Sequence, residues 1–249
     1  MDEDGFEIVK YRKRYPRKKC EARQVERLEG SVEEIQLAME KAELHLENSG
    51  FSLWVINNIR SLLGVRRVTN IYVIGNGHFD APWEPGTHQL ALMQRLCVEF
   101  GAKMIFQPIL CWFKEPCISR AEREYLSKQE KVVCRDSTDV HIQFDLTDVH
   151  SVCLVVLIHG LHSILEDFLS FIWYTNLNNI ILICNDYRDF DLIDEIAKKD
   201  SSYHFLNAFR KYATFLAFPE YVPYPSFFLN SSLAYIKHNV STQELVVCE

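Results

Sequence analysis

The stretch Val152-Cys-Leu-Val-Val-Leu-Ile158, followed by His159-Gly160, decides the fold of this chain. Its apolar, β-branched run has the length of a strand, and a strand without polar alternation is buried on both faces. From Ser163 apolar residues recur at helical spacing, and Ile180-Ile-Leu-Ile-Cys184 is a second buried run. Two buried strands joined by a helix form a right-handed parallel unit. The sequence therefore predicts a three-layer α/β fold with a mainly parallel, Rossmann-like, doubly wound sheet.

The flanking sequence supplies the rest of this predicted fold. Strands are expected at 70–74, 103–106, 131–134 and 213–218, with a closing strand or turn at 228–235. Helices are expected at 31–48, 52–63, 86–100, 119–126, 189–199 and 203–212. The segment Leu110–Cys117 contains charged residues and a proline, and it is interpreted as an exposed insertion.

Composition indicates one folded unit with a basic tail. The chain has 249 residues, of which 48% are hydrophobic, and a net charge of -7, so one core is the default. The expected organisation is a disordered basic tail over 1–30, a single α/β domain over 31–239 and a frayed tail over 240–249. The acidic start lacks the pattern of a secretory signal, and no apolar run reaches the ~20 residues of a membrane span. An intracellular protein with reduced thiols and no membrane contact is expected.

The basic segment Lys10–Lys19 is open to three interpretations. It lies within Lys10–Arg23, which carries eight of the 27 basic residues and one acid. It resembles a nuclear import signal, and it is also suited to weak contact with nucleic acid or another acidic surface. The simplest alternative is a solvated tail with no partner.

Polar residues after the predicted strands mark the place where a ligand would bind. In open parallel sheets, ligands bind beyond the carboxyl ends of strands where the strand order reverses. The candidate ligand-binding residues are Gly75, Asn76, Gly77, Gln107, His159 and Asn185. If the protein is an enzyme, His159 is the candidate catalytic residue, because it alone among them transfers protons near neutral pH. Glycines that only serve a turn are the simpler interpretation.

The sequence gives little indication of a metal site or of a known enzyme motif. His159 and His162 lack the third or fourth ligand of a zinc site, so no metal is expected. Motifs of P-loop proteins, serine hydrolases and kinases are absent from the sequence. The remaining enzyme hypothesis is a methyltransferase-like protein that binds S-adenosylmethionine or a nucleotide. Such a site favours an acidic residue after the second strand, where this prediction places Gln107. The identity of any cofactor stays open.

The order of motifs resembles the Sensitivity to Red Light Reduced family, also called the SRR-like domain, from about Phe6 to Ile236. The segments that carry the resemblance are Val73-Ile-Gly75, Gln89-Leu-Ala-Leu92, Ile118-Ser-Arg-Ala-Glu122, Leu157-Ile-His-Gly160 and Leu229-Asn-Ser-Ser-Leu-Ala-Tyr235. Several polar hallmark residues of the family differ here. The resemblance implies a non-catalytic regulatory role in circadian rhythm and clock-gene expression, and in the regulation of heme biosynthesis. Regulatory protein partners are expected with such a role, and the expected location is cytoplasm and nucleus.

Overall fold

A computed structural model of the protein describes residues 29–101, 110–130, 132–135, 148–175, 177–188 and 203–237. Several predictions lie outside these residues: most of the basic tail, the strand at 103–106, Gln107, the helix at 189–199 and the C-terminal tail. None of the described helices has the length and apolarity needed to cross a membrane.

The described strands form one sheet in the order β3-β2-β1-β4-β5-β7-β6. They are β1 (Arg67–Ile74), β2 (Leu110–Lys114), β3 (Val132–Arg135), β4 (Ser151–Leu157), β5 (Ile180–Asn185), β6 (Ala213–Ala217) and β7 (Ser231–Ile236). Neighbours from β3 to β5 pair in parallel, whereas β7 is antiparallel to both β5 and β6. Among the described strands, β7 alone therefore runs against the others, and the predicted mainly parallel sheet is confirmed.

Strand β4 is the centre of this sheet, as its sequence predicts. Every residue of β4 is buried, and β4 pairs in parallel with β5, where Val155 lies opposite Leu182. Alternate residues of β4 point to opposite faces. Leu154 belongs to one hydrophobic core and Val155 to the other. A strand that serves two cores needs an uninterrupted apolar sequence, which explains the composition of this stretch.

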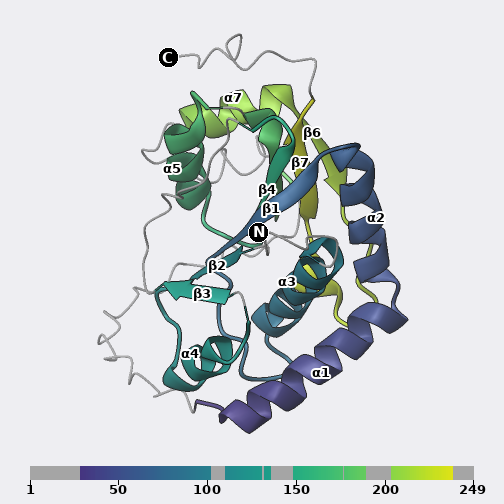
Figure 1. Ribbon diagram of the computed structural model, residues 1–249, viewed down its shortest axis with the longest axis vertical. Coiled ribbons are helices and arrows are strands. Elements are labelled where there is room, and N and C mark those ends of the chain that lie inside the picture. The colour runs from purple at the N-terminus through teal and green to yellow at the C-terminus, as the bar shows by residue number, and fades with distance from the viewer. Residues whose placement is uncertain are drawn as a thin grey trace, which may run out of the picture.

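The described helices lie on both faces of the sheet (Figure 1). They are α1 (Val32–Asn48), α2 (Phe51–Leu63), α3 (Pro85–Gly101), α4 (Arg120–Ser127), α5 (His162–Ile172) and α7 (His204–Tyr212), with short 3-10 helices η1 (Leu177–Asn179) and η2 (Pro225–Phe228). Residues of α1, α2 and α3 join the first core, and residues of α5 and α7 join the second. The predicted three layers are thus confirmed.

Two helices begin with a capping box. At α1 the Ser31 hydroxyl accepts from the Glu34 amide at 3.2 Å, and the Ser31 amide donates to Glu34 at 2.8 Å. Ser119 and Glu122 form the same reciprocal pair at α4. Each box satisfies two backbone donors that the first helical turn leaves without partners.

The interpretation of Leu110–Cys117 as an exposed insertion is wrong. Its first five residues form β2, which pairs with β1, and Cys111 and Phe113 are buried in the first core. Lys114 and Glu115 suggested a solvent-exposed segment, but both side chains are also buried. The strand beside β1 therefore ends at Lys114, and an acidic residue, Glu115, follows it.

Candidate functional site

The reversal of strand order lies between β1 and β4. From β1 the chain continues to β2 and β3 on one side, and from β4 it continues to β5 on the other. Helix α3, which follows β1, contributes to the first core, whereas α5, which follows β4, contributes to the second. The two helices therefore leave the sheet towards opposite faces. This geometry places the loops after β1 and β4 at the usual ligand position of a doubly wound sheet.

The loop after β1 is held by the carboxylate of Glu115. Gly75 and Gly77 have φ values of 65° and 72°. L-residues with a Cβ atom rarely adopt these values, whereas glycine adopts them readily. The Gly77 amide donates to Glu115 Oε2 at 2.8 Å, and the Cys117 amide donates to Glu115 Oε1 at 3.0 Å. Glu115 is 5% exposed. The carboxylate thus fixes the glycine loop to the end of β2.

The same loop packs tightly against the start of α3. The buried Asn76 donates from Nδ2 to the Gly86 carbonyl at 3.0 Å. A Cβ atom on Gly86 would lie 2.3 Å from the His78 carbonyl oxygen and 2.7 Å from that of Asn76. Gly86, in the first turn of α3, is therefore required for this close backbone approach.

His159, after β4, is joined to Asn185 at the end of β5. The His159 backbone has a φ of 54°, an unfavourable value for a residue with a Cβ. Its amide donates to Asn185 Oδ1 at 2.8 Å, and its ring Nε2 lies 3.0 Å from the Leu229 carbonyl oxygen. Asn185 Nδ2 in turn donates to the Gly160 carbonyl at 3.1 Å. These bonds hold the left-handed conformation and orient the imidazole.

The His159 contacts restrict what the ring can do. Nε2 has to carry a proton in order to donate to the Leu229 carbonyl, so in the neutral ring Nδ1 is the nitrogen that accepts a proton. The exposed position of His159 leaves the ring within reach of solvent. Proton transfer at Nδ1 is therefore chemically available, but the hydrogen bond at Nε2 already has a structural function.

A buried glutamate, which sequence reasoning did not identify as part of this region, holds the next part of the loop. Glu122 is 0% exposed and accepts from the Phe79 amide at 2.7 Å and from the Ser119 amide at 2.8 Å. His78 Nδ1 lies 3.2 Å and 3.1 Å from its two carboxylate oxygens. The capping box was the available signal, but the contact with a loop 43 residues away depends on the tertiary fold.

The predicted site residues form two hydrogen-bonded groups. His159 and Asn185 form one with Leu229. Gly75, Asn76 and Gly77 lie in the other, where the Gly77 amide donates to Glu115, which was not among the predicted residues, the Gly75 amide donates to the Lys114 carbonyl and Asn76 donates to the Gly86 carbonyl. Gln107 lies outside the described residues. His162 is linked to the first group through Tyr187, whose hydroxyl lies 3.2 Å from His162 Nδ1 and accepts from Asn185 Nδ2 at 3.4 Å. Within the described ranges, no three metal-ligating side chains of His, Cys, Asp or Glu gather in one place.

The family is established by a match to the SRR1 domain over residues 40–242, which is most of the chain. The chain belongs to the SRR1 domain family. The matched region contains the segment Ile118–Glu122, and with it the buried glutamate described above. The match begins within α1, so the basic segment Lys10–Lys19 precedes the region shared with the family. No curated protein sequence matches the chain.

The solved structures that match the chain include methyltransferases. A putative methyltransferase from the antibiotic biosynthesis pathway of Anabaena variabilis is 17% identical, with 67% of this chain and 64% of that one covered and a TM-score of 0.36. MtNAS, solved in complex with MTA and tNA, is 17% identical, with coverages of 82% and 71% and a TM-score of 0.38. Phosphoethanolamine N-methyltransferase 1 from Haemonchus contortus is 11% identical, with coverages of 86% and 52% and a TM-score of 0.40. The chain thus spans less than two thirds of the length of the first and third of these proteins.

Proposed function

We propose that this SRR1 domain protein is a non-catalytic regulator that acts in circadian rhythm and clock-gene expression and in the control of heme biosynthesis. Membership of the family supports a regulatory role. The non-catalytic role is supported by the hydrogen bonds that the polar groups at the strand ends already make within the protein. Glu115 and the ring Nε2 of His159 are bonded to backbone groups of the protein itself. A ligand would have to break these bonds before it could use the same groups.

A non-catalytic regulator acts through the macromolecules that it binds. A protein that acts without turnover must change the activity or location of other macromolecules. Regulatory proteins that bind the folded domain, and an acidic surface that contacts Lys10–Lys19, are the proposed partners. The proposed locations are cytoplasm and nucleus, because a basic segment of this kind is suited to nuclear import.

Deletion and rescue in cells test this proposal. Cells that lack the protein should show an altered amplitude or period of a clock-gene reporter and an altered heme content, and the wild-type chain should restore both. The variant His159→Asn should restore them equally, since asparagine tolerates a positive φ but does not transfer protons. Rescue by the wild type that fails with an equally abundant and equally stable His159→Asn protein would contradict the non-catalytic role.

The position of Glu115 favours a second candidate function, an enzyme that binds S-adenosylmethionine or a nucleotide. In nucleotide-binding sheets an acidic residue after the second strand accepts the ribose hydroxyls. Glu115 follows β2, which corrects the assignment of that position to the uncharged Gln107. This function requires the Glu115 carboxylate to exchange its bond with the Gly77 amide for bonds to a ribose. Binding by the wild type that is lost in Glu115→Gln would support it.

A further inference from the structure

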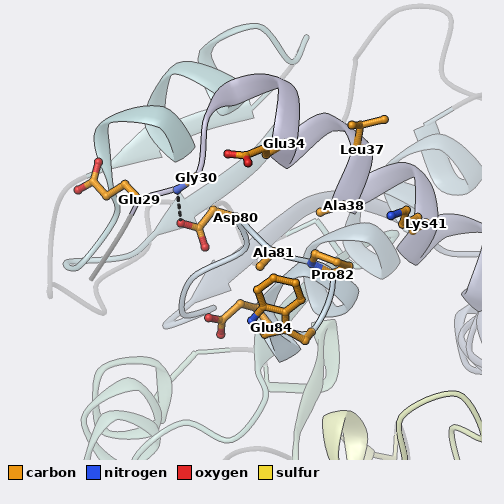
Figure 2. A pocket seen from close by; sticks show the side chains of 11 residues that line it. Glu29, Gly30, Glu34, Leu37, Ala38, Lys41, Asp80, Ala81, Pro82 and Glu84 are labelled. Carbon is orange, nitrogen blue, oxygen red and sulfur yellow. Dashed lines mark hydrogen bonds between the residues drawn. The ribbon is translucent and has the colours of Figure 1, made fainter. Parts of the chain in front are cut away.

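A groove of about 560 Å³ lies between the start of α1 and the loop that leads into α3 (Figure 2). Its lining residues are Glu29, Gly30, Glu34, Leu37, Ala38, Lys41, Asp80, Ala81, Pro82, Trp83 and Glu84. The Gly30 amide donates to Asp80 Oδ2 at 3.0 Å, so one end of the groove is fixed at the residue where the described chain enters α1. The groove is separate from the two hydrogen-bonded groups at the strand ends.

The charge of the groove favours a cationic occupant. Among the described residues that line it, four carry carboxylates, namely Glu29, Glu34, Asp80 and Glu84, and Lys41 is the one basic residue. A concave surface of one sign concentrates counter-charges and lowers their free energy. A basic segment therefore matches the groove in sign.

The walls of the groove also expose large apolar side chains. Trp83 is 70% exposed and Leu37 is 56% exposed, and Pro82 lies beside Trp83 in the lining. Exposed indole rings contact proline rings and the cationic groups of Arg and Lys favourably. The preferred occupant thus combines basic residues with aromatic or proline residues.

The chain itself contains such a segment a short distance before the groove residue Glu29 in the sequence. Lys10-Tyr-Arg-Lys-Arg-Tyr-Pro-Arg-Lys-Lys19 carries seven basic residues, two tyrosines and one proline, and it contains no acid. Lys19 precedes Glu29, a residue of the groove wall, by ten positions. Ten residues span at most about 35 Å, so the connection is long enough for the segment to turn back into the groove.

We propose that Lys10–Lys19 docks in this groove of its own chain. Tethering by a short connection gives an effective concentration of roughly millimolar, so even weak charge and apolar contacts suffice to occupy the groove. Docking covers the basic residues and competes with an import receptor or an acidic partner. The interaction weakens with salt, because exposed charges are screened beyond about 10 Å at 0.1 M ionic strength. The groove is then a regulatory element that controls access to the basic segment.

Limited digestion of the full chain with trypsin tests the docking directly, because trypsin cleaves after Lys and Arg. Mass spectrometry follows cleavage after the basic residues of Lys10–Lys19 at low and high salt. We expect at least about fivefold faster cleavage in Glu29→Gln/Glu84→Gln, and faster cleavage in Trp83→Ala, at low salt. Glutamine adds no site for trypsin. The matched control Glu220→Gln removes an exposed carboxylate outside the groove and should keep the wild-type rate.

The outcomes separate the possible occupants of the groove. Protection that is lost in the groove variants and at high salt, but does not depend on protein concentration, supports docking within one chain. Protection that increases with protein concentration would place the segment in the groove of a second copy and overturn the proposal. Equal cleavage rates in the wild type and the groove variants, with unchanged melting temperatures, would also overturn it. This assay does not depend on circadian or heme function, so its failure leaves the proposed function untouched.

Discussion

Replacement of Glu122 by alanine should destabilise the protein by about 3–5 kcal/mol, because it leaves several buried hydrogen-bonding groups without a partner. The fully buried carboxylate accepts from the Phe79 and Ser119 amides and contacts the His78 ring. It therefore fixes the capping box of α4 and the loop after β1 together. Equilibrium unfolding in urea measures the loss as a lower midpoint.

Glu124 provides the matched control on the same helix. Its side chain is exposed and forms an ion pair with Lys128 one helical turn later, at 2.9 Å. Such surface pairs contribute about 0.3–0.5 kcal/mol, so Glu124→Ala should change stability only slightly. If Glu122→Ala unfolds within about 1 kcal/mol of the wild type, the interaction network described for Glu122 is wrong.

Acidification from pH 7.5 to pH 5 should destabilise the protein through His88, by about 1–2 kcal/mol. Burial lowers the pKa of His88 to about 4; the hydrogen bond to the Pro82 carbonyl opposes this change, and nearby His45 adds to it. The unfolded state then binds more protons than the folded state between pH 6.5 and about 4. The neutral His88 ring therefore makes its full contribution to the free energy of unfolding above pH 6.5, and this contribution decreases as the pH falls towards 4.

Burial explains this preference of His88 for the neutral ring, in which both ring nitrogens still have partners. Nδ1 lies 2.8 Å from the Tyr221 hydroxyl and Nε2 lies 3.0 Å from the Pro82 carbonyl oxygen, and the residue is 1% exposed. His88→Gln removes the titration and retains a polar side chain. Urea unfolding of both proteins at the two pH values isolates the contribution of His88 from that of other groups. An equal pH dependence in the two proteins would exclude this role.

The elements that local sequence determines were predicted correctly. The apolar runs of β4 and β5 identify a buried parallel pair, and Ser31 with Glu34 identifies the start of α1. These signals depend on periodicity and on contacts within a few residues. They are consequently visible in a single sequence.

The polar contacts of the candidate site depend on residues far apart in the chain. His159 was predicted as a site residue, but its bond to the Leu229 carbonyl joins positions 70 residues apart. Glu115 was missed because charged residues and a proline concealed the end of β2, although Cys111 and Phe113 are buried there. The sequence could indicate which loops meet at the edge of the sheet. It could not indicate that the polar groups of those loops bond to each other.

Isothermal titration calorimetry of the full chain with S-adenosylmethionine tests the non-catalytic role most directly. Because Glu115 is already bonded to the Gly77 and Cys117 amides, we expect no binding heat up to about 1 mM ligand, in the wild type and in Glu115→Gln alike. Glu124→Gln serves as the matched control for the loss of a carboxylate, and melting temperatures verify that each protein is folded. Binding by the wild type and by Glu124→Gln with a Kd below about 100 μM, together with its loss in Glu115→Gln, would contradict the non-catalytic role and favour the enzyme.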